Sequence, residues 1–471
     1  MKKVLLFLLI GSILSCTEKN PSTDSVFFSG EIVNPTSDFV VLFKNDIAVD
    51  SVKLDQDNHF SFEISNIEEG LHHFYHAPEQ QYVYFEKGDS VLIRLNTVAF
   101  DESLVFSGSN EEVNNFMIDV YLNYEDEERL VNSYYKLAPE DFGHKIDSLR
   151  NQKLSELESL VVGEDLSENA FAMAKASIDY NSFLYKEKYP FYHKKKTGEN
   201  TFHKLDANFY DHRKDLDFNN KDLAFFKPYY DFMIHHFGNL SYMKCATDCG
   251  TENHLAKKNH LHLNRHKMIL IDSLVTEKDL KDNLFRNVAM DYLLKKHEAN
   301  ADCDAFIKKF ESFSTNDLHK EEITRLYHGI KNLQANKELP DVFVEDYMGN
   351  EVSLKDIADN SKTVFYFWTA SQKRHFRNVS KHVQKLQMSH PEYTFIGVNL
   401  RTGKNQWQTM VEERRLDTLS QYRSTDFERI QHTLIIDDLN KCVITKDTLI
   451  VDAFGNIYYS FKPNKKALVL N

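Results

Sequence analysis

The stretch TVFYFWTASQKRH, residues 363–375, decides the fold of the C-terminal part of the chain. Its first six residues are all β-branched or aromatic, which is typical of a strand that is buried on both faces. Residues 373–388 suit a helix, because apolar side chains recur there at helical spacing. We therefore predict a buried strand that leads directly into a helix.

Short strands and helices alternate on both sides of this stretch. Before it, we predict a strand at residues 342–344, a turn at 346–350 and a short helix at 353–357. After it, we predict a strand at 394–399, a helix at 407–414, and a closing hairpin with strands at 448–451 and 457–461. This alternation predicts an α/β domain over residues 336–471, with a central sheet covered by helices.

Five segments of this domain resemble, in order, the landmarks of TlpA-like thioredoxins. They are LPD (339–341), GNEVSL (349–354), VFYFWTA (364–370), FIGVNL (395–400) and LIVDAFGNI (449–457). In that family a Cys-x-x-Cys pair begins the helix after the Phe-Trp strand, where the helix N-terminus lowers the pKa of the first thiol. The matching positions here are Gln372 and His375, which cannot form a disulfide.

The resemblance also implies a loop with a cis-proline that faces the redox pair. The corresponding stretch, residues 443–448, contains no proline and carries Lys446 near that position. A cis peptide bond without proline costs about 2.5–4 kcal/mol, so we expect a trans loop. Both departures imply a redox-inactive thioredoxin-like domain that presents residues 372–375 beside Lys446.

The remaining cysteine of this domain is Cys442, which lies just before the predicted loop. It is the best-placed candidate for a lone reactive thiol. The alternative is a buried cysteine that packs as a small apolar side chain. No resolving partner for Cys442 is evident in the sequence, which favours the second interpretation.

A group of cysteines and histidines lies further upstream. Its members are Cys245, Cys249, His254, His260, His262 and His266. The two cysteines, and likewise His262 and His266, are four residues apart and would share a face if helical. Such residues suit zinc or copper. The sequence leaves three interpretations open: a local Cys245–Cys249 disulfide, a metal site, or residues that are unrelated in space.

Residues 111–335 show helical periodicity and predict a helical middle region. Phe142, Ile146 and Leu149 share one face, as do Ile323, Tyr327 and Ile330 further on. Aromatic residues are crowded around positions 225–232, which we interpret as core and inter-helix contacts.

Residues 26–110 predict an antiparallel β-sandwich. Short β-rich runs separated by turn residues occupy 26–33, 39–43, 47–54, 59–64, 70–76, 81–85 and 90–95. The segments FSGEI (28–32) and FSGSN (106–110), with the Asp50-Ser51 step, resemble a domain of unknown function that precedes thioredoxin-like modules in bacterial envelope lipoproteins.

The N-terminal residues predict export. Two lysines, a short apolar run and the ending ILSC at 13–16 are typical of a signal peptide, which we place at 1–15. The ending resembles the lipobox of bacterial lipoproteins, which implies lipidation of Cys16. Residues 16–25 are then a polar, lipidated tether, and the chain is anchored to a membrane of the cell envelope, facing the periplasm or the cell surface.

Composition restricts the partners further. The formal net charge is −14, and no basic cluster alternates with aromatic residues, so nucleic acid is not expected as a partner. The leading hypothesis is a lipoprotein without catalytic residues and without a cofactor. It would bind or scaffold envelope polypeptides through the groove that a thioredoxin fold retains. The alternatives are a thiol-disulfide oxidoreductase that uses Cys442 or Cys245 with Cys249, and a metal-binding envelope protein.

Overall fold

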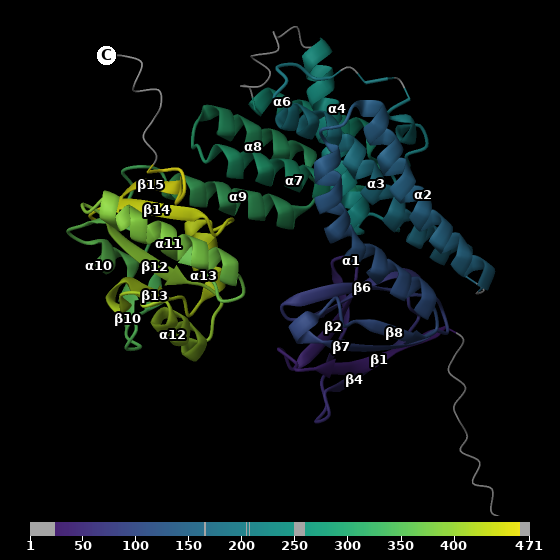
Figure 1. Cartoon of the computed structure of the whole chain (residues 1–471), viewed down its shortest axis with the longest axis horizontal. Coiled ribbons are helices and arrows are strands. Elements are labelled where there is room, and N and C mark those ends of the chain that lie inside the picture. The colour runs from purple at the N-terminus through teal and green to yellow at the C-terminus, as the bar shows by residue number, and fades with distance from the viewer. Residues whose placement is uncertain (1–23, 164–165, 204, 207, 249–259, 462–471) are drawn as a thin grey trace, which may run out of the picture. The chain divides into compact units, whose positions relative to one another are not determined.

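The computed structural model describes residues 24–163, 166–203, 205–206, 208–248 and 260–461 (Figure 1). The chain divides into two compact units, one ending at Asn239 and the other beginning at Leu240. The predicted helical region is thus divided between the two units. Cys16 and the predicted signal peptide lie outside the described residues. Within the described residues, no helix is both long and apolar enough to cross a membrane.

The first unit begins with eight strands in two sheets of four strands each. The first sheet has the order β4-β1-β7-β8, with bounds His59–Ser65, Ser25–Val33, Ser90–Asn96 and Val105–Gly108. The second has the order β3-β2-β5-β6, with bounds Ile47–Lys53, Phe39–Lys44, Gly70–His76 and Glu79–Phe85. The predicted strand positions are therefore confirmed. One detail is wrong: β1 and β7 pair in parallel, so the sandwich is not purely antiparallel.

The two sheets share one aromatic core. Phe28 of β1 lies against Phe74 of β5 and Phe85 of β6, at ring-centroid distances of 5.6 and 5.4 Å. Offset and edge-on contacts of this kind stabilise a core beyond the area they bury. Asn114 of helix α1 (Glu111–Tyr134) accepts a hydrogen bond from the Tyr84 N–H and donates one to the Tyr84 carbonyl. The helix is thereby attached to strand β6.

Helices form the rest of the first unit. They are α1, α2 (Pro139–Gly163), α3 (Glu168–Thr197) and the first half of α4 (Lys227–Asp248), with a 3-10 turn at Asp211–Arg213. Ser167 is the N-cap residue of α3, and its hydroxyl accepts a hydrogen bond from the N–H of Ala170. Many residues of α3 are buried around its circumference, so it forms the centre of the helical part.

A buried carboxylate on α3 organises its neighbours. Glu187 accepts hydrogen bonds from Arg213, from Nδ1 of His236 at 2.9 Å and from Nδ2 of Asn239 at 2.7 Å. Nε2 of His212 lies 3.4 Å from the same carboxylate. Burial alone would raise the pKa of Glu187, but these hydrogen bonds and the Arg213 charge hold it well below its usual range. Glu187 is therefore ionised, and it joins three segments of the unit.

The second unit combines helices with a seven-stranded sheet. The helices are α6 (His260–Leu274), α7 (Lys278–Lys296), α8 (Ala301–Phe313) and α9 (Asp317–Asn332). The sheet has the order β10-β9-β13-β12-β11-β14-β15. In that order its strands span Glu351–Ser353, Phe343–Glu345, Gln421–Arg423, Thr394–Asn399, Lys362–Trp368, Lys441–Lys446 and Leu449–Asn456. Strands β11, β12 and β13 are parallel, and β14 is antiparallel to β11.

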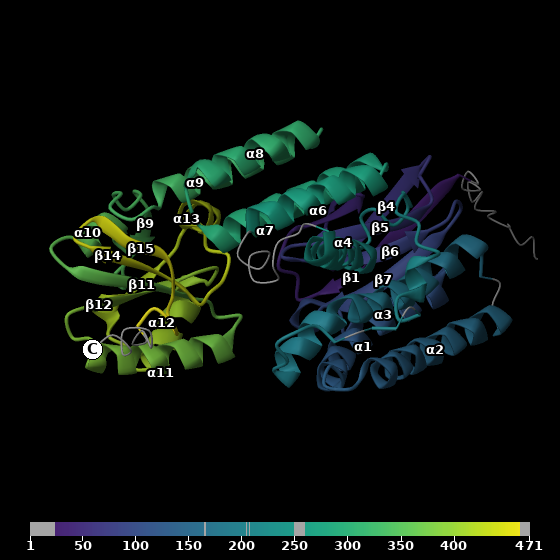
Figure 2. The same cartoon turned by 90° about the horizontal axis from the view of Figure 1, so that it is seen from above.

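Helices cover both faces of this sheet, which confirms the predicted α/β layering. They are α10 (Leu354–Ala358), α11 (Lys373–Ser389), α12 (Lys404–Glu413) and α13 (Phe427–Leu434). Val379 of α11 and Trp407 of α12 belong to one apolar cluster with Val364 of β11. Figure 2 shows α13 on the opposite side of the sheet from α11. The predicted closing hairpin is wrong, because the hairpin consists of β14 and β15 and turns at residues 447–448.

Replacing Glu187 with leucine should destabilise the first unit. Without Glu187 the charge of Arg213 is left without its partner. Breaking a buried ion pair in this way lowers the free energy of unfolding by about 3–5 kcal/mol. Urea unfolding of the full chain, followed by far-UV circular dichroism, should show this loss. Since the folded-state pKa of Glu187 is depressed, its contribution is present above the unfolded pKa of about 4.3 and is lost as the pH falls further. The difference between wild type and variant should therefore shrink below about pH 4.

The matched control is Arg129→Ala, which removes an exposed ion pair with Asp126 in the same unit. Exposed pairs contribute roughly 0–1 kcal/mol, so this variant should unfold close to wild type. Equal destabilisation by both substitutions would contradict the role assigned to Glu187.

Candidate functional site

Strand β11 and helix α11 position the residues that stand where the family's redox pair is expected. All side chains from Thr363 to Trp368 are buried. Helix α11 begins at Lys373 with Gln372 as its N-cap residue, and the Gln372 side chain makes no capping hydrogen bond. The predicted helix start is thus confirmed. The ring of Phe376 stacks on Trp368 at a centroid distance of 3.9 Å, which fixes the first turn of the helix to the end of the strand.

Gln372 and His375 differ in their surroundings. Gln372 is exposed, whereas the ring of His375 is partly buried. Burial lowers the pKa of His375, although the Asp438 carboxylate opposes this shift. Neither ring nitrogen of His375 has a hydrogen-bond partner among the described residues. Because its pKa is lowered, His375 is neutral at neutral pH, and its ring lies close to Leu439 and Asn440.

The structure corrects the predicted position of Lys446. Lys446 pairs with Lys362 at the first residue of β11, whereas residues 372–375 follow the last residue of that strand. Lys446 therefore lies at the opposite end of β11 and not beside Gln372. Residues 443–446, expected in a loop, belong to strand β14 because Val443 and Ile444 continue its buried apolar run. The segment that faces His375 is instead Asp438 to Asn440, and residues 437–441 also contain no proline.

An open hollow surrounds the start of α11. It is lined by Ser371, Gln372, Lys373, Arg374, His375, Asn378, Asn440 and Tyr458. Its lining carries two permanent positive charges and no carboxylate. The arrangement offers amide, hydroxyl and imidazole groups together with positive charge, which suits carbonyl and carboxylate groups of a bound chain. Sequence reasoning missed Asn440 and Tyr458, because no local pattern connects them with residue 372.

Lys441, which follows Asn440, does not contribute to this hollow. Its ammonium group donates to the carbonyls of Leu434 and Ile435, both at 2.7 Å, and lies 4.3 Å from the ring centre of Phe454. Burial lowers its pKa to about 8, although Asp437 and Asp452 oppose the shift. The side chain caps the C-terminal end of α13, which is a structural role.

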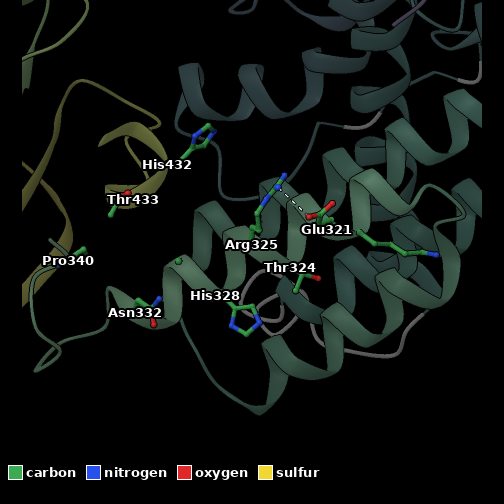
Figure 3. A pocket seen from close by; sticks show the side chains of 10 residues that line it. Glu321, Thr324, Arg325, His328, Asn332, Pro340, His432 and Thr433 are labelled. Carbon is green, nitrogen blue, oxygen red and sulfur yellow. Dashed lines mark ion pairs between the residues drawn. The ribbon is translucent and has the colours of Figure 1, made fainter. Parts of the chain in front are cut away.

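A second pocket lies between α9 and α13 (Figure 3). Its lining includes Thr324, His328, Asn332, Pro340, His432 and Thr433. The figure shows Glu321 and Arg325 paired along α9; both are largely exposed, and they are 3.5 Å apart. None of the site residues expected from the sequence lines this pocket.

The thiol of Cys442 is enclosed by the sheet. Cys442 is fully buried, and its Sγ lies against Gly455 of the neighbouring strand β15. Burial raises the pKa of the Cys442 thiol to about 12, and the Asp452 carboxylate acts in the same direction. Cys303 on α8 is also buried, with a raised thiol pKa for the same reason. Neither residue has the environment of a reactive thiolate.

Part of the upstream cysteine and histidine group comes together. Cys245 is buried on α4, and its Sγ lies 3.1 Å from Nδ1 of His266 on α6. The rings of His262 and His266 are stacked with centroids 6.4 Å apart. Cys249 and His254 lie outside the described residues, so the disulfide stays a prediction. Nor is the side chain of His260 described.

Cys442 should resist alkylation in the folded chain. At about pH 8, a thiol with a pKa near 12 has a thiolate fraction on the order of 1,000-fold below that of an ordinary cysteine. Iodoacetamide labelling followed by peptide mass spectrometry should therefore modify Cys442 only after unfolding. Rapid labelling of Cys442 in the native protein would contradict its assignment as a core residue.

No protein-family model and no curated protein matches this sequence. Solved structures similar to it include a candidate thiol-disulfide oxidoreductase from Bacteroides vulgatus, with 18% identity and a TM-score of 0.25 over 29% of this chain and 96% of that chain. A domain from Cytophaga hutchinsonii, described as a thiol-disulfide isomerase candidate, has 15% identity and a TM-score of 0.23 over 27% of this chain and 87% of that one. Likenesses this distant carry no conclusion about the activity of this chain.

Proposed function

We propose that the C-terminal module is a thioredoxin-like domain that binds polypeptide and performs no thiol-disulfide exchange. The observation that carries this proposal is that α11 begins at Lys373, so Gln372 and His375 lie at the helix start where the resemblance to TlpA-like thioredoxins implies a redox pair. Two of the buried cysteines of the second unit support it. Cys303 and Cys442 are buried with raised thiol pKa values, so neither replaces the missing thiolate.

The hollow beside α11 supports a binding role. The first turn of a helix has backbone N–H groups without partners inside the helix, and the Gln372 side chain does not cap them. Lys373 and Arg374 add positive charge to the same place. An extended chain that bears carbonyl or carboxylate groups would find complementary donors there. The proposed ligand is thus an extended, acidic polypeptide of the cell envelope.

The predicted signal peptide and Cys16 support a location in the envelope. In this proposal a lipid attached to Cys16 anchors the chain, and the segment 16–25 holds the first unit away from the membrane. The β-sandwich and the helices then present the C-terminal module to its partner.

One observation favours a second candidate function, the binding of a transition metal. Cys245 and His266 bring a sulfur and a nitrogen within 3.1 Å of each other, a separation compatible with two ligands of one ion. A site of this kind would need further ligands, for which His262 and Cys249 are the candidates. The observed pair is equally compatible with a thiol–imidazole hydrogen bond, so polypeptide binding remains the leading proposal.

The wild-type chain should show no disulfide reductase or oxidase activity above background, and Gln372→Cys with His375→Cys should create a pair that closes a disulfide. The two positions are the N-cap and the third residue of α11, which is the spacing of a Cys-x-x-Cys motif at a helix start. The first new thiol should titrate below about 8.5. Insulin reduction and thiol titration measure these outcomes. Exchange activity in the wild type that disappears with Cys442→Ser would contradict the proposal.

A photo-crosslinking residue at position 372 should capture the partner polypeptide in cells. The matched control position is Met388, which is 78% exposed near the other end of the same helix. Capture at 372 and not at 388, detected by mass shift on denaturing gels, would support binding at the hollow. Equal capture at both positions, or none at 372, would contradict it.

A further inference from the structure

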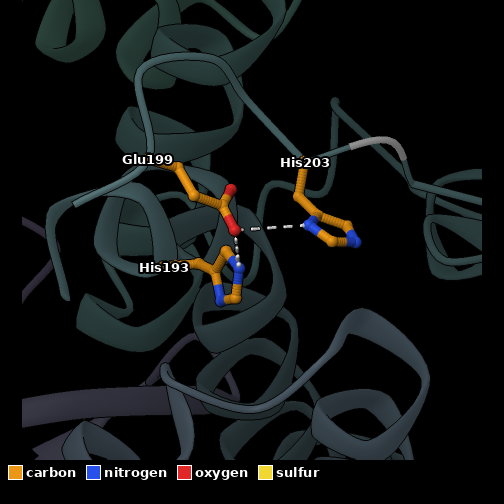
Figure 4. Close-up of side chains that lie close together, drawn as sticks. All are labelled: His193, Glu199 and His203. Carbon is orange, nitrogen blue, oxygen red and sulfur yellow. Dashed lines mark ion pairs between the residues drawn. The ribbon is translucent and has the colours of Figure 1, made fainter. Parts of the chain in front are cut away.

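A cluster of three potential metal ligands lies at the C-terminal end of α3, in the first unit. His193 belongs to the last turns of the helix, and Glu199 and His203 follow the helix end (Figure 4). Figure 4 shows the rings of His193 and His203 directed toward the Glu199 carboxylate. Nε2 of His193 lies 3.4 Å from Oε1 of Glu199, and Nδ1 of His203 lies 3.6 Å from the same oxygen.

The surroundings of His193 leave one nitrogen directed into this cluster. His193 is 4% exposed, and its Nδ1 lies 2.9 Å from the carbonyl oxygen of Tyr135. A carbonyl oxygen only accepts, so Nδ1 carries the proton and Nε2 bears a lone pair in the neutral ring. Nε2 is buried and has no hydrogen-bond partner among the described residues. A histidine whose other nitrogen donates to a backbone carbonyl is the usual form of a metal ligand.

The helix end and the following loop hold the other two residues near His193. Gly198 adopts a left-handed conformation with φ of 78°, and its N–H donates to the carbonyl of Lys194, so the chain reverses at this point. Phe202 packs edge-on against Phe191 of the helix at 5.4 Å, and the Lys194 ammonium lies 4.5 Å from the Phe202 ring centre. These contacts fix the loop just before Glu199 and just before His203, which reduces the ordering cost of binding an ion.

The spacing fits one small cation. Zinc binds histidine nitrogen and carboxylate oxygen at about 2.0–2.2 Å, so tetrahedral ligands are roughly 3.3–3.5 Å apart. The two separations from Glu199, 3.4 and 3.6 Å, are close to this value. All three ligand atoms lie within 4.8 Å of one another, and a rotation of the exposed His203 ring would close the remaining separation.

We propose that His193, Glu199 and His203 form a binding site for one zinc-like divalent cation. Two neutral imidazoles and one carboxylate supply three ligands, and the exposure of Glu199 and His203 leaves a fourth position accessible to water. The site is separate from the cysteine and histidine group around Cys245, and it contains no sulfur. It does not depend on the function proposed for the C-terminal module.

Cobalt(II) and zinc titration of the metal-free, untagged full chain tests this site. We expect one equivalent of cobalt to give d–d absorption without thiolate-to-cobalt charge transfer, and zinc to displace it. Loss of a residue that only supports a metal ligand lowers metal affinity roughly 10–100-fold. Glu199→Gln and His203→Ala each remove a ligand, so each should lower the affinity for cobalt by more than this. Both side chains are partly exposed, so we expect these variants to fold like wild type.

His144→Ala is the matched control, because His144 is an exposed histidine of the neighbouring helix α2. It should bind cobalt as wild type does. Three outcomes would overturn the proposal: no cobalt binding, binding that Glu199→Gln and His203→Ala leave unchanged, or cobalt spectra that show thiolate charge transfer alone. The last would assign the ion to the group around Cys245 instead.

Discussion

The stacking of Phe376 on Trp368 is the contact on which the C-terminal module depends. Trp368 ends a strand that is buried on both faces, and Phe376 belongs to the first turns of the helix that follows. Because two large rings pack face to face, the strand end and the helix start have little freedom relative to each other. The intervening residues 369–375 must therefore make a tight connection at the C-terminal end of β11, an inner strand of the sheet. This connection places Gln372 and His375 at the hollow.

The chemical groups exposed at that hollow depend on which neighbouring side chains are buried in the domain core. Lys441 and Cys442 begin strand β14 and directly follow Asn440, which lines the hollow. Both side chains are nevertheless buried and do not line it. The thiol packs against Gly455, and the ammonium caps α13. Burial raises the pKa of the thiol and lowers that of the ammonium, since it penalises the charged form in both cases. The groups left at the hollow are amides, hydroxyls, an imidazole and exposed cations.

Helix α3 of the first unit shows two ways to bury polar groups. Glu187 is surrounded by donors from Arg213, His236 and Asn239, so its charge is compensated. His193, nearly two turns later, has a hydrogen-bond partner for Nδ1 but none for Nε2 among the described residues, although Nε2 lies 3.4 Å from the Glu199 carboxylate. A buried nitrogen without a partner is costly unless a ligand occupies it. The first arrangement supports the structure, and the second supports the inferred cation site.

The sequence by itself determined the strand positions of the sandwich, the buried strand β11 and the start of α11, because the periodicity of apolar residues is a local property. It also determined that residues 372 and 375 are not cysteines. Only the tertiary structure decided that β1 and β7 are parallel, that Val443 and Ile444 continue a strand, and that Asn440 rather than Lys446 lies near His375. The cluster of His193, Glu199 and His203 was equally hidden, because their spacing matches no motif until Gly198 reverses the chain. The physical reason is that strand pairing and chain reversal bring together residues whose sequence separation carries no periodic pattern.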